Sequence, residues 1–166
     1  VGFAAMDEAT TGSDSVAVGY SAGHSVTTGI ENTFVGYYAG GETTTVNYNS
    51  AFGSSALGSN TTGANNVAVG RAALYTNTTA SDNTAIGKHA MYANTTGAAN
   101  VAVGSNVLDA NTTGNYNTSV GYDSSTAITT GGNNTAVGYK SLEALTTGSS
   151  NVAVGTSALN DVTTVS

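Results

Sequence analysis

The fold is decided by residues 66–116, which read NVAVGRAALYTNTTASD, NTAIGKHAMYANTTGAA and NVAVGSNVLDANTTGNY in three consecutive blocks of seventeen. Each block opens with Asn, places Gly at its fifth position and carries Thr-Thr at its thirteenth and fourteenth positions. The same spacing runs through the whole chain without an insertion or a deletion. A short repeat without slippage indicates identical units stacked on one another, because an extra residue would break the stack.

Two residue types mark the repeat along most of the chain. Positions are counted from the Asn that opens each block, and the residues that share a position are called a column. Column 1 holds Asn, except that Ser15 takes its place in the first full block. The column 1 asparagines are Asn32, Asn49, Asn66, Asn83, Asn100, Asn117, Asn134 and Asn151. The column 5 glycines are Gly19, Gly36, Gly53, Gly70, Gly87, Gly104, Gly121, Gly138 and Gly155.

Columns 2 to 4 predict a short strand in each block, with side chains that alternate between two faces. Column 4 is apolar throughout, as at Val69, Val103 and Val137, and we expect it to face the interior. Column 3 is Ala or another small residue except at Phe34, so it would lie on the outer face. A small apolar residue there indicates that another surface packs closely against it, since polar side chains would be expected to face water.

The rest of the block predicts turns and a second apolar segment. The column 5 Gly turns the chain out of the strand through φ values that a Cβ disfavours. An apolar pair such as Ala73-Leu74 then faces the strand, and Thr78 and Thr79 begin the return turn. The column 1 Asn side chains either hydrogen-bond along the stack or are present because Asn tolerates turn geometry. We therefore expect an all-β fold, a parallel β-solenoid (β-roll) of about ten 17-residue coils.

The repeat also bears on domain organisation and assembly. Residues 1–166 form a single repetitive segment, and we expect it to belong to a longer fibre protein because neither end carries an atypical capping unit. Each coil offers few large apolar side chains to offset the conformational entropy of ordering seventeen residues. We therefore expect further burial between identical chains, with coils intertwined or packed side by side as a homotrimer.

The composition excludes several classes of partner. The net charge is -7, and Arg71, Lys88 and Lys140 are the only basic residues besides histidine. Such a chain cannot neutralise a phosphate backbone, so we expect no nucleic acid as a partner. The sequence also contains no apolar run of transmembrane length, and we expect no membrane insertion in this segment. The absence of Cys excludes disulfides and thiolate metal sites.

The sequence gives no sign of catalysis. His24 and His89 occupy different columns, and the ten acidic residues are scattered over variable positions without a repeated pair. A recurrent Asp in a nine-residue glycine-rich frame, as calcium-binding solenoids require, is missing. We therefore expect no enzymatic activity, no catalytic residues, no cofactor and no metal.

Two further patterns concern the surface. Column 6 places Tyr20, Tyr37, Tyr122 and Tyr139 directly after the glycine, where they would form aromatic strips for glycan contact or shield neighbouring backbone. Asn-Thr-Thr triplets match a glycosylation acceptor, although the repeat itself contains this triplet by construction. They begin at Asn60, Asn77, Asn94 and Asn111.

The segment 134–142, NTAVGYKSL, and the segment 94–97, NTTG, resemble the NTAxGYxAL…NTTG repeats of phage tail-fibre and related bacterial surface proteins. The Asn-Val-Ala-Val-Gly core is also similar to the shorter head repeats of trimeric autotransporter adhesins. The first resemblance implies a fibre protein, and many proteins with such repeats carry a C-terminal intramolecular chaperone that trimerises and cleaves itself off. The second implies left-handed parallel β-rolls wound as a trimer.

These observations predict the structural shaft or head of an extracellular fibre, on a virion tail or a cell surface, that gives a stiff rod for attachment. Three alternatives stay open: a self-assembling extracellular filament, an adhesin head that binds a cell-surface glycan or receptor, and an ice-binding solenoid. Ice binding would use threonine ladders, but adjacent threonines in a strand point in opposite directions.

Overall fold

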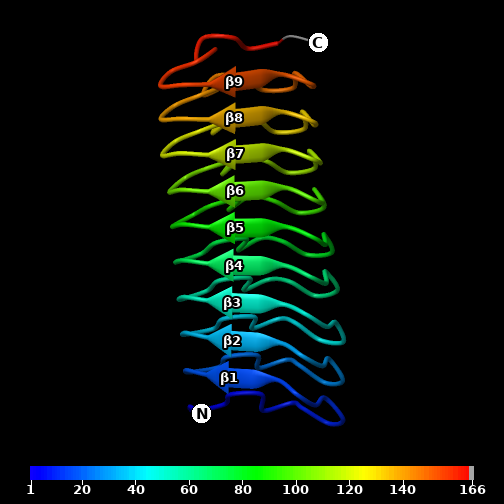
Figure 1. Ribbon diagram of the computed structural model, residues 1–166. Coiled ribbons are helices and arrows are strands. Elements are labelled where there is room, and N and C mark those ends of the chain that lie inside the picture. The colour runs from blue at the N-terminus through cyan, green and yellow to red at the C-terminus, as the bar shows by residue number, and fades with distance from the viewer. Residues whose placement is uncertain (165–166) are drawn as a thin grey trace.

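The computed structural model describes residues 1–164 as one stack of coils with a single short strand in each (Figure 1). Nine strands of three residues lie side by side, in sequence order, in one parallel sheet. They are β1 Val16–Val18, β2 Thr33–Val35, β3 Ser50–Phe52, β4 Val67–Val69, β5 Thr84–Ile86, β6 Val101–Val103, β7 Thr118–Val120, β8 Thr135–Val137 and β9 Val152–Val154. The chain climbs along one axis, with its N-terminus and C-terminus at opposite ends of the stack (Figure 1).

The register of the sheet follows the sequence period. Val67 pairs with Thr84, Ala68 with Ala85 and Val69 with Ile86, and all other strand pairs keep the same offset. Each strand thus lies directly over the equivalent residues of the next coil. The expected all-β parallel β-solenoid with 17-residue coils is confirmed. Within residues 1–164, no helix has the length and apolar character that crossing a membrane requires.

The two faces of the strands are the reverse of the sequence prediction. Column 3 faces the interior, and the side chains of Ala68, Ala85 and Ala102 are completely buried. Column 4 faces outward, and Val137 keeps 37% of its surface exposed. The prediction that Val69, Val103 and Val137 line the core is therefore wrong. The interior is narrow because large side chains of the opposite wall, such as Leu74, already fill it, so only a small residue fits on the strand side.

Phe34 is the exception that explains this rule. It is the only large residue in column 3, and it is fully buried. Opposite it, column 9 holds Gly23 and Gly40 where most other coils have Leu or Met. A Cβ at Gly40 would lie 2.4 Å from the Phe34 ring, so the ring occupies the space that a column 9 side chain takes elsewhere. The larger side chain on the strand side is thus offset by the missing side chains on the opposite wall, and the core stays filled.

The wall opposite the strands contains the expected apolar pair, but in an unusual backbone conformation. Columns 7 and 9 have positive φ in nearly every coil, as at Leu74 with φ 50° and His89 with φ 58°. Left-handed backbone is costly for a residue with a Cβ. Here it lets N–H groups reach both neighbours: His89 donates to the Arg71 carbonyl at 3.0 Å, and Met91 donates to the Val107 carbonyl at 2.9 Å. This wall is thus tied along the axis without being a β-strand.

The column 5 glycines end the strands. Their φ values lie between 127° and 143° from Gly2 to Gly155. An added Cβ at Gly87 would lie 2.2 Å from the carbonyl oxygen of Gly104 in the next coil. The glycine is therefore required both by the backbone conformation and by the closeness of the stacked coils.

Candidate functional sites: inner ladders and outer faces

The column 1 asparagines form a hydrogen-bonded ladder inside the stack. The backbone N–H of Asn83 donates to Oδ1 of Asn66 at 3.0 Å, and Nδ2 of Asn83 donates to the Gly97 carbonyl at 2.9 Å. The first bond joins neighbouring coils, and the second fastens the return turn of the same coil. Equivalent pairs of bonds recur from Asn49 to Asn134. Of the two explanations open from the sequence, the structure shows axial hydrogen bonding by the side chains.

A second asparagine ladder occupies column 12. Nδ2 of Asn94 donates to Oδ1 of Asn77 at 2.8 Å and to the Gly97 carbonyl at 2.9 Å. The four members Asn60, Asn77, Asn94 and Asn111 are completely buried. In the folded chain their amides are therefore inaccessible to a glycosylating enzyme, which agrees with the explanation of the triplets as part of the repeat. The sequence could have indicated this burial, because other coils place Val, Ile or Leu in column 12 and none places a charged residue there.

The second ladder ends where the sequence changes. Column 12 continues with Ile128 and Leu145, both buried. Oδ1 of Asn111, which would accept from an asparagine at position 128, is left without a hydrogen-bond partner. A buried amide at this column is thus stabilising mainly when its neighbours along the stack are also amides.

The two threonines of each Thr-Thr pair have different surroundings: the first is hydrogen-bonded along the stack, and the second faces solvent. The backbone N–H and Oγ1 of Thr78 both donate to the carbonyl of Thr95, each at 3.2 Å. The same hydroxyl bond recurs in column 13 along the stack. Thr79, in column 14, is exposed. Because the column 13 hydroxyls are already bonded to carbonyls, the pair presents one threonine per coil to solvent and no double row.

The outer face of the sheet is uncharged along its whole length. Columns 2 and 4 supply it: column 4 is apolar in every coil, and column 2 is Val, Thr or Ser. Val101, Phe52 and Ile86 each leave more than a third of their surface exposed. We call these two columns, from β1 to β9, the strand face. An exposed row of apolar side chains such as column 4 marks a site of interaction more often than a surface that only faces water.

The variable face consists of columns 6, 7 and 10, on the turns that follow each strand. All three Lys and Arg residues of the chain lie in columns 6 and 7. The column 6 tyrosines named from the sequence are about half exposed and form two separate groups. Tyr20 stacks between Phe3 and Tyr37 at centroid distances of 5.4 and 5.5 Å, whereas Tyr122 stacks on Tyr139 at 5.9 Å. Ser, Arg and Lys occupy the coils between, so the aromatic strip is not continuous.

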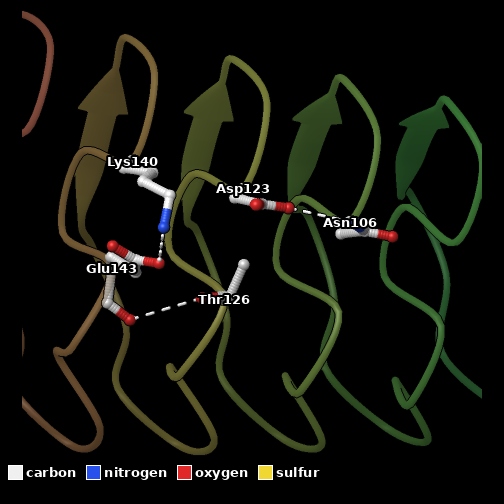
Figure 2. Close-up of polar contacts among 5 residues, drawn as sticks. All are labelled: Asn106, Asp123, Thr126, Lys140 and Glu143. Carbon is white, nitrogen blue, oxygen red and sulfur yellow. Dashed lines mark hydrogen bonds and ion pairs between the residues drawn. The ribbon is translucent and has the colours of Figure 1, made fainter.

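The C-terminal part of the variable face neutralises its own charges. Lys140 and Glu143 extend toward each other, and Nζ lies 2.7 Å from Oε1 (Figure 2). This hydrogen bond raises the pKa of Lys140. Asp123 instead accepts a bond of 3.0 Å from Nδ2 of Asn106 in the preceding coil (Figure 2). Lys140 and Glu143 thus pair within one coil, whereas Asn106 and Asp123 are hydrogen-bonded between neighbouring coils because the 17-residue offset places them side by side.

The remaining ionisable groups with resolved contacts lie apart from one another on the variable face. Nδ1 of His24 lies 3.9 Å from Oε1 of Glu8, and His89 is in a different region of the variable face. Tyr38 donates to Glu42, and this hydrogen bond is the main cause that raises the pKa of Tyr38 to about 12. Residues 1–164 contain no group of three or more His, Asp or Glu side chains placed to hold a metal ion.

Comparisons with protein families, with curated proteins and with solved structures find no significant match to this chain. The fold and its surfaces define a β-solenoid with a filled core, one uncharged outer face and one variable outer face.

Proposed function

We propose that this chain is the shaft or head of an extracellular fibre, on a virion tail or a cell surface, in which identical chains pack through their strand faces into a stiff rod. The observation that carries the proposal is the uncharged strand face, whose apolar column 4 runs along all nine strands. A monomer in water would leave this surface uncovered, and a second and third copy offer surfaces of the same length and period. The number of three rests on the sequence resemblance to trimeric fibres.

The interior of the stack supports a mechanical role. Backbone, asparagine and threonine hydrogen bonds all run along the axis from coil to coil. Pulling or bending the rod would have to break several of these bonds in one coil together, which favours stiffness. The role requires no cofactor and no catalytic group, and attachment to a host or surface would be made by the variable face or by neighbouring domains.

Sedimentation equilibrium of the 166-residue chain tests the proposal. We expect a trimer, and we expect the double variant Val69→Lys, Val103→Lys to be monomeric because it places charges in the strand face. The matched control is Thr79→Lys, Thr113→Lys, which adds the same charges to column 14 and should remain trimeric. A wild-type chain that stays monomeric at its highest soluble concentration would exclude the proposal. Indefinite filaments in electron micrographs would favour the self-assembling filament instead.

A second candidate function, ice binding, is favoured by one specific observation. The strand face holds two regular outward columns of Val, Thr, Ile and Ser on a parallel sheet, a repetitive array without charge. Such an array, and not the Thr-Thr pair, would be the ice-binding surface. Thermal hysteresis from a monomeric chain, lost in the Val69→Lys, Val103→Lys variant, would support this candidate. A trimer without hysteresis would exclude it.

A further inference from the structure

The central coils of the variable face contain a hollow with a volume of about 370 Å³. Six side chains matter for its chemistry, and they come from the turns after β3, β4 and β5: Ser54, Ser55, Arg71, Tyr75, His89 and Tyr92. The volume lies within the range of small-molecule sites. The 17-residue offset assembles the hollow, because Tyr92 follows Tyr75 by one coil and His89 lies one coil beyond Ala72.

One wall of the hollow is aromatic. Tyr75 and Tyr92 stack with ring centroids 5.5 Å apart and planes inclined by 14°. The His89 ring lies 5.2 Å from the Tyr92 ring at a steeper angle. The parts of this ring stack that line the hollow form a rigid apolar wall against which the C–H groups of a sugar ring can pack, and the nearby serines provide hydrogen-bonding groups.

The other side of the hollow is cationic. Nη1 of Arg71 lies 3.3 Å from Nε2 of His89, and Lys88 follows Arg71 one coil later in column 6. Burial, followed by the charges of Lys88 and Arg71, lowers the pKa of His89. This lowering favours the neutral imidazole, and in the tautomer that leaves Nε2 unprotonated this atom accepts a hydrogen bond from the guanidinium and orients it.

Among residues 1–164, these two cations differ from Lys140 in having no carboxylate as an ion-pair partner. The ion pairs within residues 1–164 are His24–Glu8 and Lys140–Glu143, so no carboxylate lies within ion-pair distance of Arg71 or Lys88. Figure 2 shows the contrasting arrangement, in which Glu143 neutralises Lys140 in the same coil. In a chain with a net charge of -7, the central coils thus keep two cations beside an aromatic platform and available to a ligand.

We propose that this hollow binds a carboxylated sugar unit, such as a hexuronate, of a cell-surface polysaccharide. The sugar ring packs on Tyr75 and Tyr92, and the Arg71 guanidinium holds the carboxylate through two parallel hydrogen bonds. Lys88, one coil beyond Arg71 in column 6, adds positive charge to these coils, and Ser54 and Ser55 of the lining face the sugar hydroxyls. This inference deepens the proposed function, on which it rests, because it names the ligand class and the coils through which a fibre would contact its target surface.

The test is a ¹H–¹⁵N NMR titration of the 166-residue chain with a tetrasaccharide of alternating glucuronate and N-acetylglucosamine. Cellotetraose serves as the neutral probe, and a fully sulfated tetrasaccharide without carboxylates tests the alternative anion. We expect the acidic probe to shift the amide signals of the turns after β3, β4 and β5. We expect Arg71→Gln to weaken its binding about tenfold, the effect of losing a charged hydrogen bond.

Tyr92→Ala should weaken binding of the same probe, while Lys140→Gln, a cation of the same face outside the hollow, should leave it unchanged. Unaltered thermal melting checks that each variant is folded. Absence of shifts with millimolar acidic probe would overturn the proposal. So would equal binding by Arg71→Gln, equal binding of cellotetraose, or tighter binding of the sulfated probe.

Sedimentation of the same samples separates this proposal from the fibre function. A trimer that does not bind the acidic probe would overturn the sugar site and leave the fibre proposal standing. A monomer that binds it would support the site and contradict assembly through the strand face.

Discussion

The strand side of each coil, columns 1 to 5, and the variable face, columns 6, 7 and 10, have the same axial backbone bonding but very different freedom of sequence. On the strand side, column 1 is Asn and column 5 is Gly through nearly the whole chain. On the variable face, column 6 alone contains Tyr, Ser, Arg, Lys and Thr. This difference indicates that a few buried side chains and the glycines are sufficient to specify the coil. The side chains of the variable face can then differ from coil to coil without altering the backbone.

The most damaging change on the strand side should be Gly87→Ala. It forces a φ of 137° on a residue with a Cβ and brings that atom against the Gly104 carbonyl. We expect a loss of about 3 kcal/mol or more in the free energy of unfolding, measured by chemical denaturation. Ser105→Ala, one position after the next glycine and on the variable face, should change it by about 0.5 kcal/mol or less. Equal midpoints for the two variants would contradict the requirement for glycine.

Breaking the continuous asparagine ladder should have the next largest effect. Asn83→Ala leaves the backbone N–H of Asn100 without its acceptor, Oδ1 of Asn83, and removes a donor to the Gly97 carbonyl. Burying an unsatisfied group costs about 1–3 kcal/mol, and we expect a destabilisation of that size. The control is Thr96→Ala, which truncates an exposed column 14 side chain. If both variants unfold at the same denaturant concentration, the ladder does not stabilise the rod.

The interrupted ladder of column 12 sharpens the comparison. Asn94→Val removes a member bonded on both sides, so Oδ1 of Asn77 and Nδ2 of Asn111 each lose a partner. Asn111→Val removes the last member, whose Oδ1 has no partner. We expect Asn94→Val to be more destabilising by about 1 kcal/mol. The same denaturation curves measure this; equal losses for the two variants would show that position in the ladder does not matter, and a larger loss for Asn111→Val would contradict the prediction outright.

Changes on the variable face should have the smallest effect on folding. Tyr139→Ser introduces the residue that column 6 already carries at Ser54 and Ser105. The stacking on Tyr122 and an exposed cation–π contact with Lys140 are lost, so we expect about 1 kcal/mol or less and an unchanged circular-dichroism spectrum. A loss as large as that of Asn83→Ala would mean that the variable face is part of what specifies the coil.

The sequence was sufficient for the architecture but not for which side of the strand is inside. An unbroken 17-residue period leaves stacking as the solution, and the glycine column locates the strand ends. Alternation places columns 2 and 4 on one face, yet it does not say which face is buried. The larger Val of column 4 led to the wrong choice, because the interior is filled from the opposite wall by residues such as Leu74.

Internal comparison of the repeats contained the missing information. Phe34 in column 3 coincides with Gly23 and Gly40 in column 9, which is a volume exchange across a shared interior. In the same way, the hollow was hidden because Arg71, Tyr75, His89 and Tyr92 look scattered along the chain. Shifting the sequence by seventeen residues places Tyr75 beside Tyr92, and only the backbone conformation of the turn brings Arg71 to His89.

The central claim is that the strand face is outward in each chain and covered by other copies in the assembled rod. Because the natural chain has no Cys, thiol labelling of single-cysteine variants measures this directly. Val137→Cys lies on the strand face, and Thr113→Cys on column 14 is the exposed control. Under native conditions at high concentration, we predict that Val137→Cys reacts slower than Thr113→Cys by on the order of tenfold or more. Equal labelling rates for the two cysteines would contradict the claim.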